Sequence, residues 1–214
     1  TLTASSAGTH LLEFEVNDGT TTIIDSTYYT VNPVVNIVNP TITGLVNGVN
    51  YINDTTVIFQ LYAPQKQHVY VIGGFNNWTP TAAYHMNLST NNATWWLEVT
   101  GLTAGQKYGY QYFIDGTMKF ADPLSSLILD PNNDGNINAL TNPNPLPYPT
   151  GQTTGFVSVF QPGATPYDWQ NTSFQGPAKK DLVIYELLVR DFVAKHNYQT
   201  LIDTLAYLDN LGIN

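Results

Sequence analysis

Alternation of apolar and polar positions is the main structural signal between residues 50 and 130. Val57, Phe59 and Leu61 share one face of an extended segment, and the three tyrosines of 107–114 do the same further along. The predicted strands cover residues 57–63, 68–74, 95–99, 107–114 and 118–120. Short strands at this spacing, with turn signals such as Asp-Gly between them, predict an immunoglobulin-like β-sandwich of about a hundred residues.

Residues 10–31 predict a β-hairpin ahead of this sandwich. Leu12, Phe14 and Val16 lie on one face of the first strand, glutamates lie on the other, and Asn-Asp-Gly at 17–19 supplies the turn. Two strands alone are too few for a stable sheet. We therefore expect residues 1–35 to be the C-terminal hairpin of an upstream immunoglobulin-like module, or an arm that packs on the next part of the chain.

The pattern changes at residue 181. Residues 181–189 form a nearly continuous apolar run, which is typical of a strand buried on both faces, such as a parallel one. Apolar residues at 201, 205, 208 and 211 then form a helical stripe, and Gly212 stands at the C′ position of that helix. A single β-α pair cannot form a parallel sheet, so 181–214 is expected to be the truncated start of a larger α/β fold.

Proline is concentrated in residues 131–180, and this opposes both helix and central strand. An extended connector is predicted there, with one short strand at 156–160 as an option. The predicted fold is therefore mainly β. It consists of a hairpin at 1–35, a β-sandwich at 36–135, a proline-rich linker at 136–180, and a first strand and helix at 181–214.

The composition narrows the set of partners. Only 11% of the 214 residues are charged, against about a quarter in typical proteins, and the net charge is −9. The acidic net charge argues against nucleic acid and anionic membranes as binding partners. The sequence contains no run of about eighteen apolar residues, so no membrane-spanning helix is predicted. A neutral polymer is compatible with this charge as a binding partner. The absence of cysteine excludes disulfides and thiolate metal sites and fits an exported protein, extracellular, on the cell surface or periplasmic.

The most informative stretch is 69–78, Val-Tyr-Val-Ile-Gly-Gly-Phe-Asn-Asn-Trp. Its strand leads into Gly73 and Gly74, which permit either a positive φ or a close approach of the backbone. Two turn-forming asparagines then separate Phe75 from Trp78. Large aromatics most often plug a core, whereas an exposed indole stacks on the C–H face of a glucose ring. Both alternatives stay open, with burial tendencies favouring the core.

Several motifs in the predicted sandwich resemble carbohydrate-binding module family 48. That module stands at the N-terminus of starch-debranching and branching enzymes and in the β subunit of AMP-activated kinase. The matching positions are Gly-Phe-Asn-Asn-Trp at 74–78, Trp-Trp at 95–96, Gly105, Tyr-Gln-Tyr-Phe-Ile-Asp-Gly at 110–116 and Ala-Asp-Pro at 121–123.

A second resemblance lies near the C-terminal end. Leu-Val-Ile-Tyr-Glu-Leu-Leu-Val-Arg-Asp-Phe at 182–192 looks like the first barrel strand of family 13 glycoside hydrolases, the α-amylase family, and 201–214 is similar to the helix after it. Tyr-Asp-Trp at 167–169 resembles the segment before that strand. In this family a (β/α)8 barrel carries an aspartate nucleophile, a glutamate acid/base and a second aspartate after its fourth, fifth and seventh strands. The chain ends before the second strand, so we expect it to contain none of these three carboxylates.

The first resemblance also implies positions for sugar binding. Glycogen-binding members use the Trp of Phe-Asn-x-Trp, a lysine in Tyr-Lys-Phe and a second Trp after Asp-Gly. Trp78 matches the first, whereas Gln111 replaces the lysine and a methionine or phenylalanine replaces the second Trp. The candidate carbohydrate-binding residues are Trp78, Asn76, Trp96 and Gln111. Departures at two of three positions imply weak binding or none.

Other ionisable residues predict neither a catalytic site nor a metal site. Glu186, Asp191 and Asp203 are expected to be solvated or ion-paired, and the four histidines lack the i, i+4 spacing of zinc ligands. Asp-Pro-Asn-Asn-Asp-Gly at 130–135 mimics the start of a calcium loop, but Thr141 stands where the position-12 acid belongs. No metal and no cofactor is expected.

These observations predict the accessory N-terminal part of an α-glucan-active glycoside hydrolase that acts on starch, pullulan or glycogen. The chain itself is expected to be inactive. Its expected partners are an α-glucan oligosaccharide, bound weakly or not at all, and the catalytic barrel of the same chain. The alternative is a starch-binding or purely structural β-sandwich without catalytic function.

Overall fold

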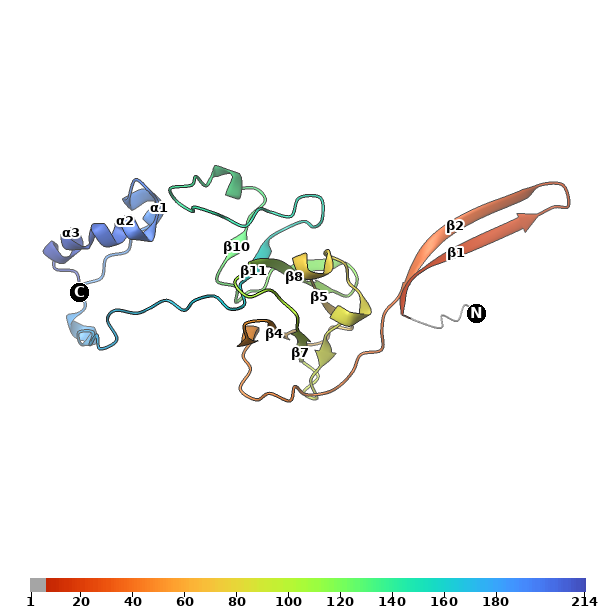
Figure 1. Cartoon of the computed structure of the whole chain (residues 1–214), viewed down its shortest axis with the longest axis horizontal. Coiled ribbons are helices and arrows are strands. Elements are labelled where there is room, and N and C mark those ends of the chain that lie inside the picture. The colour runs from red at the N-terminus through yellow and green to blue at the C-terminus, as the bar shows by residue number, and fades with distance from the viewer. Residues whose placement is uncertain (1–6) are drawn as a thin grey trace. The chain divides into compact units, whose positions relative to one another are not determined.

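The computed structural model describes residues 7–214, which are mainly β (Figure 1). The chain divides into two compact units. The first runs up to Asp130 and includes Tyr148–Ala164, and the second comprises Pro131–Pro147 and Thr165–Asn214. Among residues 7–214 there is no helix with the length and apolar character needed to cross a membrane.

The N-terminal hairpin is present as predicted. Strands β1 (Gly8–Asn17) and β2 (Thr22–Val31) pair antiparallel along their whole length and form a two-stranded sheet (Figure 1). In the turn, Asp18 Oδ1 accepts hydrogen bonds from the backbone N–H groups of Thr20 and Thr21, and these bonds lower the pKa of the Asp18 carboxyl to about 2. The apolar face is solvent-exposed: Val16, for example, retains 68% of its accessible surface.

One sheet of the sandwich has the strand order β3-β4-β7-β6. Its strands are β3 (Gly48–Asn53), β4 (Thr56–Tyr62), β6 (Asn87–Leu88) and β7 (Thr94–Val99). The incoming segment 36–47 packs on this sheet, and its Asn36 and Val38 exchange backbone hydrogen bonds with Leu88 of β6. There Gln60 Nε2 donates to the Leu45 carbonyl at 3.5 Å, and Asn39 exchanges hydrogen bonds with Thr90. The side chain of Ile58, which alternates with the core residues Val57 and Phe59, is buried as well.

The other sheet has the order β10-β11-β8-β5, with β9 paired to β8. Its strands are β5 (Val69–Gly73), β8 (Tyr108–Ile114), β9 (Met118–Phe120), β10 (Ile128–Leu129) and β11 (Val157–Phe160). Two single-turn 3-10 helices, η1 (Gly74–Asn76) and η2 (Ala82–Tyr84), connect β5 to β6. The strands predicted over 68–74, 107–114 and 118–120 are thus confirmed.

The hydrophobic core lies between the two sheets. Alternate residues of β4 and β8, namely Val57, Phe59, Tyr108, Tyr110 and Tyr112, point into it, as their alternation in the sequence predicts. Phe59 contacts the Tyr110 ring at a centroid distance of 4.9 Å, and Phe160 of β11 meets the same two rings edge-on. This two-layer arrangement is an immunoglobulin-like β-sandwich.

Strand β11 comes from the proline-rich segment. The short strand considered at 156–160 is present, and it pairs with β8 through Ser158, Val159 and Phe160. The first unit consequently includes Tyr148–Ala164, a part of the segment 136–180 that the proline pattern places in a linker. Composition misses this contribution because the pairing partner lies about fifty residues earlier in the chain.

The second unit is largely irregular. Residues 182–188 form no strand and Ile184 remains 81% exposed, because among the described residues no strand pairs with them. The helices are short: η3 (Asp134–Asn136), η4 (Lys179–Asp181), α1 (Val189–Phe192), α2 (Tyr198–Asp203) and α3 (Leu205–Asn210). The helix predicted by the apolar stripe at 201, 205, 208 and 211 is thus present as two consecutive helices that meet at Thr204.

The predicted C-terminal cap of this helical stretch is confirmed. Gly212 adopts a φ of +75° just past α3. Its N–H donates to the Asp209 carbonyl at 2.8 Å, and the N–H of Ile213 donates to the Leu208 carbonyl at 3.4 Å. This pair of bonds is the Schellman arrangement, which requires a left-handed residue at C′ and therefore favours glycine.

Candidate functional site

Trp78 stands at the end of the turn that follows β5. Asn77 and Trp78 both adopt left-handed backbone conformations, with φ of 52° and 58°, and the Trp78 N–H donates to the Gly73 carbonyl at 3.0 Å. This geometry folds the indole back over β8, where a Cβ on Gly109 would lie 3.4 Å from the ring. Trp78 is only 8% exposed, so the indole packs on the outer face of the sheet and presents no open ring face.

Asn76 holds the same turn onto the strand. Its Oδ1 accepts from the Gly73 N–H at 2.8 Å, and its Nδ2 donates to the Val71 carbonyl at 2.9 Å. Both polar atoms of the Asn76 amide are therefore used within the protein. The role visible here is to close the turn between β5 and Trp78.

Gln111 is fully buried on the outer face of β8 beneath the loop that leads into β11. Its Nε2 donates to the carbonyls of Thr154 and Phe156 at 2.9 and 2.7 Å, and its Oε1 accepts from the Thr153 hydroxyl at 2.6 Å. A neutral amide suits this place because it offers donors and an acceptor at once, whereas a lysine offers only donors. Gln111 thus anchors the loop over the sheet.

Trp96 belongs to the other sheet. It lies half-buried on the outer face of β7, where its Nε1 donates to the Val38 carbonyl at 2.7 Å. The structure therefore brings Trp78, Asn76 and Gln111 to the sheet that contains β5 and β8, and separates Trp96 from them. Carbohydrate contact by these four residues stays a prediction.

The two glycines before Phe75 differ sharply in their surroundings, and neither has a positive φ. A Cβ on Gly73 would collide with the Gly109 carbonyl oxygen and lie 2.8 Å from the Phe75 ring, whereas a Cβ on Gly74 would meet nothing within 4 Å. Two reasons favour glycine in such a stretch, a positive φ or a close approach of the backbone. The close approach is the one that applies, and it applies at Gly73.

We expect Gly73→Ala to lower the free energy of unfolding by about 1–3 kcal/mol, because the extra methyl group forces β5 away from β8. Gly74→Ala is the matched control and is expected to be neutral or slightly stabilising. Urea denaturation of the two variants measures the difference. Equal stabilities would show that the approach of β5 to β8 is not tight.

A buried carboxylate organises the core side of the same sheet. Asp122 Oδ2 accepts hydrogen bonds from the hydroxyls of Tyr110 and Tyr112 at 2.8 and 2.9 Å, and the Asp122 N–H donates to Ser158 Oγ at 2.7 Å. Burial, with the neighbouring Asp122 carboxylate second, raises the pKa of both tyrosine hydroxyls. The cluster joins β8, β11 and the segment after β9, and its groups satisfy one another.

Two histidines make contact at the edge of the β5 strand. His68 Nδ1 lies 3.1 Å from His85 Nε2, and the Tyr70 ring lies 4.7 Å from the His85 ring. Burial, followed by the neighbouring His68, lowers the pKa of His85 from 6.5 to about 4. The folded protein therefore binds a proton at His85 more weakly than the unfolded chain does.

This contact predicts a loss of stability in acid. The stabilising contribution of His85 is present above pH 6.5 and is lost as the pH falls toward 4, because the unfolded chain takes up the proton first. With solvent screening, the expected loss is about 1–2 kcal/mol. Urea denaturation at pH 7 and pH 4.5 should show this loss in the wild type and in His196→Asn, an exposed control, but not in His85→Gln. The same acid loss in His85→Gln would contradict the prediction.

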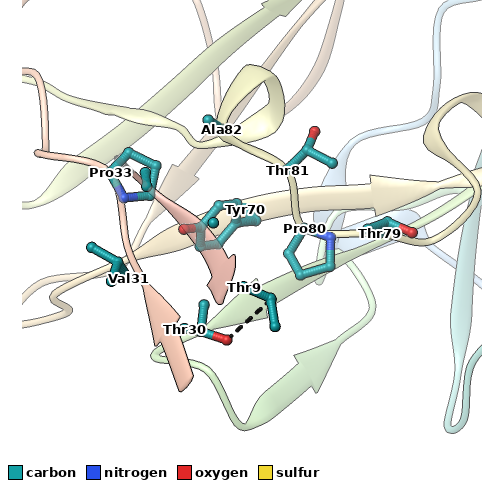
Figure 2. Close-up of a pocket in the computed structure, with 11 residues that line it drawn as sticks. Thr9, Thr30, Val31, Pro33, Tyr70, Thr79, Pro80, Thr81 and Ala82 are labelled. Atoms are coloured by element: carbon teal, nitrogen blue, oxygen red, sulfur yellow. Dashed lines mark hydrogen bonds between the residues drawn. The ribbon is translucent and has the colours of Figure 1, made fainter. Parts of the chain in front are cut away.

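The first unit also contains a pocket of about 330 Å³ that no local motif indicates (Figure 2). Its lining comes from the base of the hairpin, from Tyr70 on β5 and from residues 79–82 after Trp78. The sequence pattern misses it because the contributing segments are far apart in the chain. Among residues 7–214, no three histidine, aspartate or glutamate side chains are grouped so that they could hold a metal ion.

A model of a known protein family matches most of the sandwich. Residues 47–133 match the model of the family described as Carbohydrate-binding module 48 (Isoamylase N-terminal domain). The match covers β3 to β10 of the sandwich and the turn that carries Trp78. A comparison with curated protein sequences found no match.

Solved structures with the same fold come from larger proteins. A putative alpha amylase from Salmonella typhimurium is 23% identical, with a TM-score of 0.51 over 78% of this chain and 23% of that chain. The catalytic module of the glycogen-degrading pneumococcal virulence factor SpuA, in complex with an inhibitor, is 21% identical. Its TM-score is 0.52, and the match covers 79% of this chain and 26% of that chain. A product complex of SpuA is 17% identical, with a TM-score of 0.51, and the match covers 96% of this chain and 23% of that chain.

The chain spans about a quarter of the length of these solved structures. At this level of identity the likeness shows the fold. The family match over residues 47–133 coincides with most of the folded sandwich in the first unit.

Proposed function

We propose that the chain is the accessory region of an α-glucan-active glycoside hydrolase and is not catalytic by itself. The observation that carries this proposal is the family match over residues 47–133, which coincides with the folded sandwich. Starch, pullulan or glycogen is the proposed substrate class of the parent enzyme. Export to the cell surface, the periplasm or the medium is part of the proposal and is supported by the absence of cysteine.

The proposal includes a catalytic barrel that begins at residue 181. In a β-α-β unit the chain returns after the helix to lie beside the first strand. Asn214 does lie beside Val183: its Oδ1 accepts from the Val183 N–H at 2.9 Å, and its own N–H donates to the Val183 carbonyl at 3.4 Å. This contact supports residues 182–188 and the residues around 214 as neighbouring strands of the barrel.

A specific observation favours a scaffold role for the module over tight sugar binding. Trp78 and Gln111, at the positions where glycogen-binding relatives contact sugar, are buried, and the polar atoms of Gln111 are satisfied within the protein. A ligand at Gln111 would have to displace residues 153–156, which hydrogen-bond to its amide. The module is therefore proposed to support the barrel and to contribute only weak glucan contacts.

Isothermal calorimetry with maltoheptaose tests this proposal. We expect a dissociation constant in the millimolar range or weaker. The β-linked cellohexaose serves as the control for linkage, and circular dichroism of each variant confirms that it is folded. A micromolar constant for maltoheptaose that a folded Trp78→Ala variant abolishes would overturn the scaffold role.

A further inference from the structure

The pocket at the base of the hairpin has a defined wall on each side. Thr9 and Thr30, paired across β1 and β2, form one side, and residues 79–82 form the other, with the Tyr70 ring between them (Figure 2). The Tyr70 hydroxyl donates to Asn32 Oδ1 at 3.1 Å, and this bond holds the hairpin base against β5. At about 330 Å³ the pocket lies at the small end of the usual range for small-molecule sites, about 300–1,000 Å³.

The polar groups of the lining are mainly hydroxyls. Thr9 Oγ1 and Thr30 Oγ1 lie 3.3 Å apart, so one of the two remains able to donate outward. Thr79 Oγ1 donates to the Asn77 carbonyl at 3.1 Å and keeps its acceptor capacity, and the Thr81 hydroxyl makes no hydrogen bond within the described part of the chain. The pocket thus offers both donors and acceptors to a ligand.

The rest of the lining is apolar and uncharged. Tyr70, Pro80 and Pro33 supply flat hydrophobic surface, and no aspartate, glutamate, lysine, arginine or histidine is among the lining residues. A charged ligand would find no counter-ion here, and burying an unpaired charge is costly. A ligand with C–H faces and several neutral hydroxyls matches both kinds of surface.

We propose that this pocket binds a neutral sugar unit, which under the proposed function is a glucosyl residue of an α-glucan. The inference rests on that function for the identity of the sugar, but not for the chemistry of the pocket. The pocket is separate from Gln111 and from the buried face of Trp78, and it adds the N-terminal hairpin to the binding surface. Its size limits the ligand to one or a few sugar units.

Titration of the ¹⁵N-labelled full chain with maltotriose, followed by NMR, tests the pocket. The expected result is a set of amide shifts at Thr9, Thr30, Thr81 and their neighbours, with a millimolar dissociation constant. Ala82→Phe fills the pocket and is expected to weaken binding at least about fivefold. Ala83→Phe, at the neighbouring exposed residue that does not line the pocket, is the matched control and should leave binding within about twofold.

Thr81→Val provides a second variant that removes only a hydroxyl, with Thr27→Val on the same hairpin as its control. Maltotriose could instead cause amide shifts only on another surface, with the same affinity in Ala82→Phe as in the wild type. This result would overturn the proposed sugar site in the pocket and leave the proposed function standing. Pocket shifts with xylotriose or cellotriose but not with maltotriose would support the pocket as a sugar site and count against the α-glucan function. No shifts with any of these sugars would overturn the pocket, whereas the scaffold role does not require them.

Discussion

Trp78→Ala is expected to lower the free energy of unfolding of the sandwich by about 3–5 kcal/mol, the usual cost of removing a buried tryptophan from a packed site. The indole covers Gly109 on β8, and Val157 on β11 contacts the same spot. Its loss would leave a cavity that the turn after β5 cannot close, because the turn is tied to β5 by Asn76. Thermal unfolding should show a fall in melting temperature on the order of 10 °C.

Trp169→Ala is the matched control for this prediction. Trp169 is 72% exposed, so the same truncation is expected to change stability by no more than about 0.5 kcal/mol. The prediction fails if Trp78→Ala melts like the wild type. Such a result, combined with loss of maltoheptaose binding, would instead establish Trp78 as a sugar platform.

The second large effect is expected at the buried carboxylate. Asp122→Ala removes the shared acceptor of the Tyr110 and Tyr112 hydroxyls and leaves two buried donors without a partner. An unsatisfied buried donor costs about 1–3 kcal/mol, so the expected destabilisation from the two hydroxyls is about 2–6 kcal/mol. Urea denaturation monitored by tyrosine and tryptophan fluorescence measures it.

The double replacement of Tyr110 and Tyr112 by Phe isolates this mechanism. When both hydroxyls are absent, Asp122→Ala should cost clearly less than it does in the wild type, because no buried donor is left unpaired. Glu98→Ala, an exposed acidic residue on β7, is expected to be near neutral. An equal cost of Asp122→Ala with and without the two hydroxyls would show that the tyrosine bonds do not account for the effect.

These expectations point to a module whose recognisable sequence features are largely structural. Trp78 and Asn76 close a turn, Gly73 allows β5 to approach β8, and Gln111 fastens a loop. The same features lie within residues 47–133, the part of the chain that matches the family model. Family-typical residues in this chain therefore identify a fold more directly than they identify a ligand site.

The strands and turns are the part of the fold that the sequence alone predicted well. The period-two alternation of β4 and β8 matches the two-layer core, and Asp18 and Gly212 occupy the turn and cap that their residue types favour. These signals are local, because each depends on neighbours within a few residues in the chain. Local physics therefore determined the secondary structure of the sandwich and the hairpin.

The strand predicted over 181–189 marks the limit of local signals. Its apolar run is typical of a strand buried on both faces, but a parallel strand forms only against a partner. Among the described residues no strand pairs with it, and residues 182–188 remain irregular. A buried strand is thus a property of the sheet around it as well as of its own residues.

Burial at the candidate site was decided only by the tertiary structure. The sequence left Trp78 as either core or platform, and the placement of Gly109 beneath the indole and of residues 153–156 over Gln111 makes both side chains interior. The pocket likewise arises where Thr9 and Thr30 lie opposite residues 79–82, which are far from them in the sequence. Contacts between residues that are distant in the sequence determine which polar and aromatic groups are exposed to solvent, so a local sequence pattern does not predict this exposure. The sequence alone determined the strands, the turns and the family resemblance of this protein, whereas the tertiary structure decided which of its residues are free to meet a ligand.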